Sequence, residues 1–111
     1  MNSTTGQRLW DEAKLGRSVL ILSASPKRRD RAFEVVREVV VEDGMHLGYF
    51  AKSNGGGRIT ADVARGVIIF LSETQQNSLR GMSVDIALIE SPDCPPDVES
   101  LVRMVARQVF L

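Results

Sequence analysis

The stretch GVIIFLSETQQNSLRGMSVDIALIES, residues 66–91, decides the fold class of this chain. Two short apolar runs, 67–72 and 84–90, flank a polar loop that contains Leu79-Arg80-Gly81, and the second run ends on the acid Glu90. Runs of this length without polar alternation are typical of strands that are buried on both faces of a sheet. Residues 18–23 (SVLILS) form a third such run. The chain therefore carries the strands of a buried central sheet.

Helical patterns lie between these strands. Ser25 followed by Pro26 is typical of a helix start, with serine as N-cap and proline in the first helical position. Apolar residues at helical spacing predict that this helix runs to about Glu42, and Asp43-Gly44 ends it. The remaining predictions are helices over 5–15 and 97–110, strands over 45–52 and 58–62 joined by the turn 54–57, and a loop or single helical turn over 73–81.

This order of elements predicts an α/β fold, a three-layer sandwich with helices on both faces of a mixed central sheet of about five strands. An antiparallel hairpin portion is expected around residues 45–72. A length of 111 residues suits a single domain over 1–111. No apolar run approaches the ~18 residues that span a bilayer, so we expect no membrane partner.

Composition excludes several classes of protein. Apolar residues make up 43% and charged residues 25% of the chain, the balance of an ordinary globular domain. Lys and Arg number 14 and Asp and Glu number 14, so any surface that binds an anion must come from local clustering. The single Cys94 forms no internal disulfide, which favours a cytoplasmic setting. One His (His46) and one Cys are too few for a zinc site, and no catalytic residue is predicted.

The order of these pieces resembles the RecA-like ATPase core of phage large terminases and related helicases. The resemblance covers roughly residues 7–92 and rests on a helix ending at Gly16, a strand ending near Ser25, a helix, a hairpin region, a strand, the Leu79-Arg80-Gly81 loop and the acidic strand. It implies a fold like that of P-loop NTPases, a phage or prophage origin and a place in the cytoplasm of a bacterial host.

Two departures from the family pattern bear on activity. The 111 residues contain no GxxxxGK[ST] phosphate loop, which the family places before the position of residue 7. The acidic strand of the family ends in Asp-Glu, one acid for Mg²⁺ and one to activate water, and the matching pair here is Glu90-Ser91. We therefore expect a non-enzymatic module without a cofactor or metal, and a degenerate nucleotide site around Ser25 and Glu90 is a lesser alternative.

The dense basic cluster of the chain follows Pro26, where Lys27, Arg28, Arg29 and Arg31 occupy the first turns of a predicted helix. Cations there oppose the helix dipole, and the free N–H groups of the helix end favour anions, so the cluster suits a phosphate backbone. A solvated helix end, compensated by Asp30 and Glu34, explains the same pattern without a ligand. The predicted nucleic-acid contacts are Lys27, Arg28, Arg29, Lys52, Arg58 and Arg80.

These observations give a leading hypothesis and an alternative of a different class. The leading hypothesis is a non-catalytic terminase-like module that binds DNA or joins a protein complex that processes DNA. The alternative is a protein-interaction or regulatory module, a homo-oligomer with no nucleic-acid role. The zero net charge and the apolar end Val109-Phe110-Leu111 favour the alternative.

Overall fold

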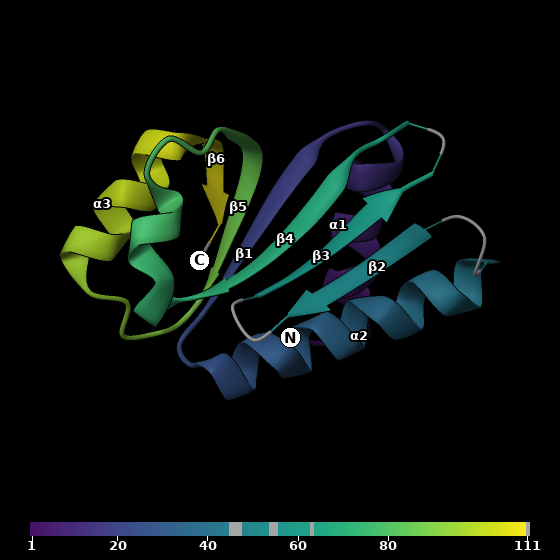
Figure 1. The fold of residues 1–111 in the computed structure, drawn as a ribbon, viewed down its shortest axis with the longest axis horizontal. Coiled ribbons are helices and arrows are strands. Elements are labelled where there is room, and N and C mark those ends of the chain that lie inside the picture. Colours follow the sequence, from purple (N-terminus) through teal and green to yellow (C-terminus); the bar gives the residue numbers. More distant parts are fainter. Residues whose placement is uncertain (45–47, 54–55, 63, 111) are drawn as a thin grey trace.

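The computed structural model describes residues 1–44, 48–53, 56–62 and 64–110. Three predicted features lie partly outside these residues: the start of strand 45–52 with His46, the turn at Asn54-Gly55, and the terminal Leu111. The elements along the chain are α1 (Ser3–Lys14), β1 (Ser18–Ser23), α2 (Pro26–Gly44), β2 (Gly48–Ser53), β3 (Gly56–Ala61), β4 (Val67–Ser72), the 3₁₀ helix η2 (Glu73–Leu79), β5 (Val84–Glu90), α3 (Pro96–Val105) and β6 (Ala106–Phe110), as drawn in Figure 1.

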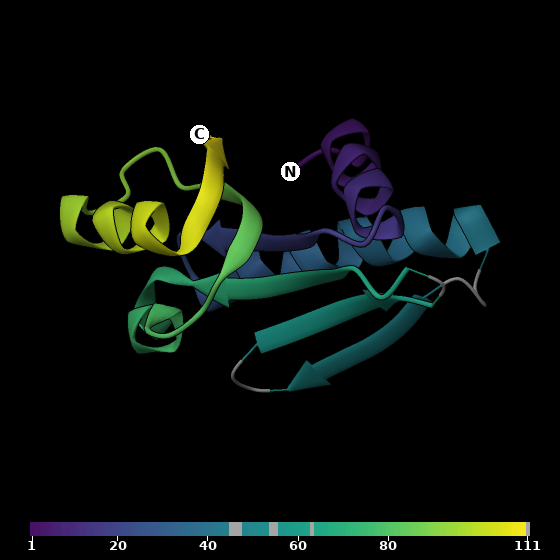
Figure 2. The same ribbon diagram turned by 90° about the horizontal axis from the view of Figure 1, so that it is seen from above.

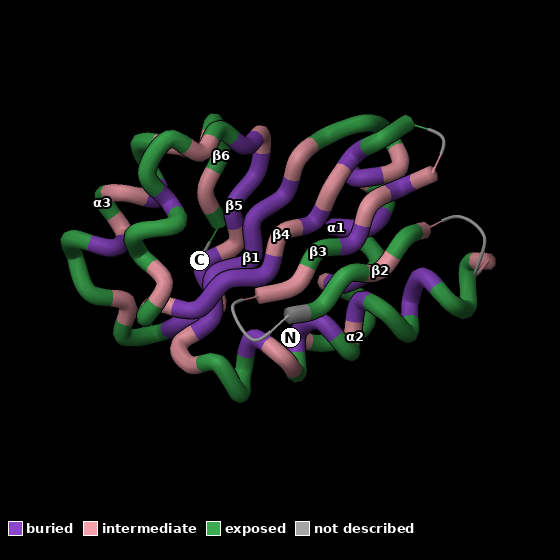
Figure 3. Tube along the Cα trace, viewed as in Figure 1, coloured by how far each residue is buried: buried purple, intermediate pink, exposed green. Residues whose placement is uncertain are grey.

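The strands of the described chain form one mixed sheet in the order β2-β3-β4-β1-β5-β6. β1, β4, β5 and β6 run parallel, and β2 and β3 extend the sheet beyond β4 as an antiparallel hairpin. Val19 of β1 lies between Ile68 of β4 and Ile86 of β5, so the apolar runs occupy the middle of the sheet. Figure 3 shows buried residues along nearly all of β1, of which only the first residue, Ser18, is partly exposed. The predicted α/β class, mixed sheet and hairpin are confirmed.

α1 and α2 cover one face of the sheet (Figures 1 and 2). The apolar stripe of α2 packs there, and the rings of Phe33 and Phe70 meet edge to face with centroids 5.2 Å apart. Glycine is required where α1 crosses the start of β4, because a Cβ on Gly66 would lie 1.9 Å from the carbonyl oxygen of Ala13. This contact holds α1 directly against the sheet.

α1 is also fastened to the C-terminal end of α2. Trp10 is fully buried and donates its indole N–H to Oδ2 of Asp43 at 2.8 Å, and Lys14 donates to the same oxygen at 2.8 Å. The bonds from Lys14 and Trp10 hold the pKa of Asp43 below its ordinary value, and the bond to Asp43 raises the pKa of Lys14. The predicted packing of Trp10 against the body is confirmed, and Asp43 is its polar partner.

The opposite face is covered only in part. α3 and η2 pack over β1 and β5, where Leu20, Leu22 and Ala87 form a second core with Leu79 of η2 and Val102 of α3. Alternate residues of β1 thus enter different cores, which explains why its sequence is apolar throughout. Helices on both faces give the three layers that the sequence predicts.

The C-terminal segment differs from its prediction. The helix expected over 97–110 ends at Val105, because Ala106 is extended with φ −113° and ψ 142°. The following residues form β6, whose register with β5 runs from Val84 opposite Ala106 to Leu88 opposite Phe110. Valine spacing continues the helical pattern as far as Val109, but pairing with the edge of β5 supplies backbone hydrogen bonds that a helix cannot offer to that edge. The sheet therefore has a sixth strand that the sequence pattern does not reveal.

Candidate nucleic-acid interface

The carboxyl ends of β1 and β5 lie side by side where the connections of the chain diverge. The chain that leaves β1 through α2 returns on the β4 side, whereas the chain that leaves β5 through α3 returns on the β6 side. Open α/β sheets bind ligands in the crevice outside such a switch point. A crevice of about 420 Å³ lies here, and a hollow of about 240 Å³ shares Arg28 and Glu90 with it. The crevice is lined by Arg28, Ile89, Glu90, Ser91, Pro92, Cys94 and Glu99. The hollow is lined by Met1, Arg28, Arg31, Ala32 and Glu90.

The N-terminus of α2 brings positive charge to this crevice. The Oγ of Ser25 accepts the backbone N–H of Arg28 at 3.2 Å, which confirms Ser25 as the predicted cap. The first turn of α2 contains no acid, and Lys27, Arg28 and Arg31 are exposed. None of these three cations forms an ion pair with a described residue. We call Lys27, Arg28 and Arg31 the α2 cation cluster.

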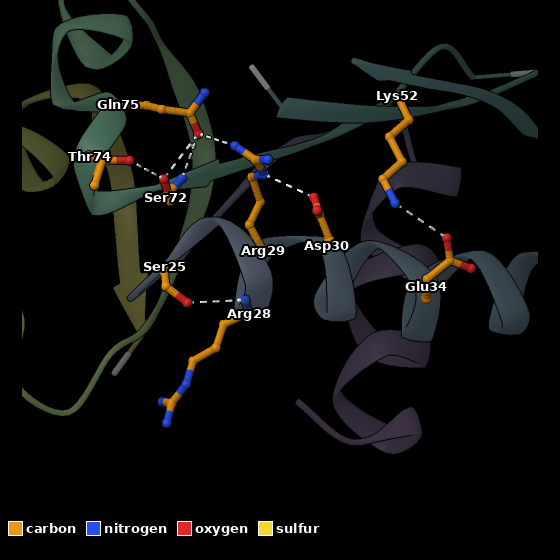
Figure 4. A network of polar contacts seen from close by, with 9 residues as sticks. All are labelled: Ser25, Arg28, Arg29, Asp30, Glu34, Lys52, Ser72, Thr74 and Gln75. Carbon is orange, nitrogen blue, oxygen red and sulfur yellow. Dashed lines mark hydrogen bonds and ion pairs between the residues drawn. The ribbon is translucent and has the colours of Figure 1, made fainter. Parts of the chain in front are cut away.

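Arg29 lies inside the protein rather than in this cluster. It is 5% exposed, and its Nη1 donates to Oε1 of Gln75 at 2.9 Å while its Nε donates to Asp30 at 3.2 Å. Gln75 Oε1 also accepts the backbone N–H of Ser72 at 2.9 Å, so Arg29 ties α2 to the carboxyl end of β4 (Figure 4). Figure 4 also shows the side chain of Arg28 pointing away from this network. Arg29 therefore positions the helix end, and the prediction that it joins an exposed contact surface is corrected.

Lys52 is directed toward α2. Its Nζ lies 3.7 Å from Oε1 of Glu34 and 5.5 Å from the ring centroid of Phe33 (Figure 4 shows the pair with Glu34). This placement gives the ammonium group of Lys52 both an acidic partner and an aromatic ring beneath it. Lys52 lies on the α2 side of the hairpin, opposite Gly57, and lines one shallow hollow together with Arg58.

Arg58 and Arg80 lie on two other parts of the surface, away from the α2 cation cluster. Arg58 is exposed on β3, and because its neighbour Ile59 is buried beneath α2, Arg58 faces the opposite side of the sheet from Lys52. Arg80 is exposed at the C-terminal end of η2. The six predicted contact residues thus do not form one surface, and of them only Lys27 and Arg28 line the α2 end.

Glu90 and Ser91, which correspond to the acidic pair in the resemblance, both have partners within the chain. The N-terminal ammonium of Met1 lies 2.8 Å from Oε2 of Glu90, and the hydroxyl of Ser91 donates to Oε1 of Glu73 at 2.8 Å. The ion pair balances the charge of Glu90, so this acid does little to offset the α2 cation cluster. No local sequence pattern indicates the ion pair between Met1 and Glu90, because the two residues lie far apart in the sequence.

Cys94 lines the crevice beside Arg28 and Glu90. Burial, together with the charges of Glu73 and Glu99, raises the pKa of the Cys94 thiol. No group of His, Cys, Asp and Glu side chains in the described ranges is placed to hold a metal ion. No described helix is long and apolar enough to cross a membrane.

Comparison with solved structures identifies the fold. The chain superposes on the large terminase ATPase domain of Thermus phage P74-26 with a TM-score of 0.61 at 15% identity, covering 97% of this chain and 54% of that one. This chain has the RecA-like fold of a phage terminase ATPase domain. An arginine-to-alanine mutant of the same domain gives a TM-score of 0.56 at 11% identity, again with 97% and 54% coverage. No protein-family model and no curated protein match the sequence.

The match has a defined extent. This chain spans about half the length of the terminase domain, with 54% of that domain covered. The resemblance inferred from the order of strands, helices and loops is thereby confirmed at the level of the fold.

Proposed function

We propose that this chain is a non-catalytic, terminase-like module of phage or prophage origin that binds DNA, alone or within a complex that processes DNA. The observation that carries the proposal is the α2 cation cluster at the switch point of the sheet. Lys27, Arg28 and Arg31 are exposed, lack acidic partners among the described residues and surround a helix N-terminus.

The electrostatics of this helix end favour a polyanion. Cations in a first turn oppose the helix dipole by about 0.3–1 kcal/mol each, so the sequence places them where they weaken the helix slightly. Pro26 has no N–H, and the N–H groups of Arg28 and Arg29 are bonded to Ser25, so the attraction for an anion comes from the exposed cations and the positive end of the helix dipole. Because the net charge of the chain is zero, the attraction is local to this end rather than spread over the surface. A phosphate backbone supplies repeated negative charge that satisfies all three side chains together.

The absence of catalysis is part of the proposal. The 111 residues contain no GxxxxGK[ST] loop to hold phosphates. Glu90 is paired with the Met1 ammonium, and the position after it carries a serine that is bonded to Glu73. The position that carries the second acid in the family pattern thus holds a hydroxyl, which does not activate water as a carboxylate does.

The test is DNA binding by a triple variant in which Lys27, Arg28 and Arg31 are replaced by glutamine. We expect binding to labelled duplex to be lost while the melting temperature stays within about 2 °C, because these side chains are exposed and make no ion pairs with described residues. A matched control replaces Arg8, Arg37 and Arg103, which are exposed on other parts of the surface, and removes the same charge. Binding that survives in the triple variant, or is lost equally in the control, refutes the proposal.

A second candidate is the homo-oligomeric interaction module, for which the β6 edge is the specific observation. β6 pairs only with β5 among the described strands, and Phe110 is 51% exposed beside a groove of about 270 Å³ between α1 and β6. A bare strand edge with an exposed aromatic side chain favours pairing with another chain. If this candidate holds, Phe110→Ser lowers the mass measured by light scattering to that of one chain. An unchanged mass argues against it.

A further inference from the structure

The hairpin half of the sheet has one open face. α1 and α2 lie behind β2, β3 and β4, and α3 and η2 are displaced toward β1 and β5 (Figures 1 and 2). No helix among the described residues covers the other side of β2 and β3. Strand alternation and register place Tyr49, Ala51, Arg58, Thr60 and Ile69 on this side.

Tyr49 presents a fixed aromatic ring on the open face. Its side chain is 57% exposed, although its hydroxyl donates to Oδ1 of Asp62 at 2.7 Å. The bond anchors the far end of the ring, and it also raises the pKa of Tyr49. Asp62 is therefore engaged with the tyrosine hydroxyl. An exposed ring held in one orientation is a ready surface for stacking.

Two arginines flank this ring. Arg58 is exposed on β3, diagonal to Tyr49 across the β2–β3 pair, and Arg65 is exposed in the turn before β4. Neither forms an ion pair with a described residue. Arg65 also has a left-handed backbone with φ +62°, an unfavourable conformation for a side chain of this kind. The open face thus combines an aromatic ring with two arginines, whose positive charge exceeds that of the single carboxylate of Asp62 beside the ring.

A shallow hollow continues the face beside Arg58. Its volume is about 380 Å³, and it lies at the glycine end of the hairpin, where its lining includes Ala51, Ile69 and Leu71 of the open face and Lys52, Gly57 and Phe70 of the α2 side. Small side chains and bare backbone keep the floor low between Arg58 and the end of β4. A flat apolar floor next to an arginine suits a planar base whose phosphate lies at the rim.

We propose that this face, the Tyr49 platform (Tyr49, Arg58, Arg65 and Ile69), binds single-stranded nucleic acid. One base stacks on Tyr49, a neighbouring base covers Ile69, and Arg58 and Arg65 contact phosphates. The inference rests on the proposed function, that the chain binds DNA, and adds which strand state this second surface accepts. A single strand is required because a duplex keeps its base faces stacked internally, so the tyrosine ring cannot reach them.

The test compares Tyr49→Ala with Tyr49→Phe by fluorescence anisotropy, using labelled oligothymidylate and a labelled blunt duplex of equal length. Loss of one base–aromatic stack corresponds to an affinity about 5- to 150-fold weaker. We expect a loss of this size when Tyr49→Ala binds the single strand. Tyr49→Phe keeps the ring and should remain within about threefold of the parent. Both variants should bind the duplex within about twofold of the parent, and circular dichroism verifies that they are folded.

A second readout concerns charge. Arg58→Gln should reduce the slope of log affinity against log salt for the single strand by about 0.7, the value expected for one phosphate contact. An oligonucleotide that contains 5-bromouracil should, on irradiation, crosslink to the peptide that contains Tyr49.

The outcomes separate this inference from the proposed function. Single-strand affinity unchanged in Tyr49→Ala, or no single-strand binding by the parent, overturns the platform and leaves the open face to a partner of another class, such as a protein. Duplex binding that persists in the Lys27, Arg28 and Arg31 variant overturns the proposed function of α2 without affecting the Tyr49 result.

Discussion

Replacing Asp43 with alanine removes the acceptor that fastens α1 to α2. The indole N–H of Trp10 lies in a fully buried residue and reaches Asp43 Oδ2 at 2.8 Å, whereas Lys14, which donates to the same oxygen, is 35% exposed. A buried donor left without an acceptor costs about 1–3 kcal/mol, and hydrogen bonds to charged groups lie in the upper part of that range. We expect Asp43→Ala to lower the free energy of unfolding by about 1.5–3 kcal/mol.

The assay is urea denaturation at pH 7 followed by Trp10 fluorescence, with a thermal melt as a check. A loss of this size lowers the melting temperature by roughly 6–15 °C in a domain of this length. The matched control is Lys14→Ala, which removes the ion pair, keeps the indole bond and should cost no more than about 1 kcal/mol. Equal costs for the two variants would refute the reasoning, because the buried indole bond would then contribute nothing.

The pKa of Asp43 gives the same prediction a pH dependence. Its folded-state pKa is lowered, first by the bond from Lys14 and then by the bond from Trp10. A lowered carboxyl pKa contributes stability that is present above the unfolded value of about 3.9 and is lost as the pH falls through the folded value. The difference between the parent and Asp43→Ala should therefore be full at pH 7 and shrink below about pH 4. A difference that grows in acid contradicts the assignment.

Two further predictions concern packing and the reassigned arginine. Gly66→Ala should lower the free energy of unfolding by about 3 kcal/mol or more, because the new Cβ would lie 1.9 Å from the Ala13 carbonyl oxygen. Gly81→Ala, at φ +79° with open space around it, should lower it by only about 1–2 kcal/mol. Urea denaturation measures both values, and similar losses contradict the close approach of α1 to Gly66. Arg29→Met should lower the melting temperature and leave the DNA affinity of the folded protein within about twofold of the parent. Arg28→Gln should weaken DNA binding and leave the melting temperature nearly unchanged. A large loss of affinity with an unchanged melting temperature for Arg29→Met would return Arg29 to the contact surface.

The centre of the fold follows from local sequence, whereas its edges do not. The apolar runs of β1, β4 and β5 leave few alternatives to a buried sheet, and Ser25-Pro26 marks the start of α2 with capping chemistry that the structure reproduces. β6 is different, because its valine and phenylalanine suit a helix face or a strand equally. Pairing with β5, a contact distant in sequence, decides between the two.

The arrangement of the predicted contact residues also depends on contacts between distant parts of the sequence. Sequence reveals the cluster of cations after Pro26, but burial alone distinguishes Arg29 from its neighbours, and burial depends on where Gln75 lies. The separation of Lys52 from Arg58 depends on the hairpin register, which sets which face each residue occupies. Tyr49 carries no local signal, because its exposure depends on the fact that none of the described helices covers that side of β2.

The salt dependence of duplex binding tests the central claim most directly. Fluorescence anisotropy of the parent and of the Lys27, Arg28 and Arg31 triple variant, measured over a range of salt, gives the slope of log affinity against log salt. Each phosphate contact contributes about 0.9 to the slope, so three contacts predict a difference of about 2.7 between the two proteins. Tight binding at low salt with this difference is the predicted result. No binding at low salt, or equal slopes, contradicts the account.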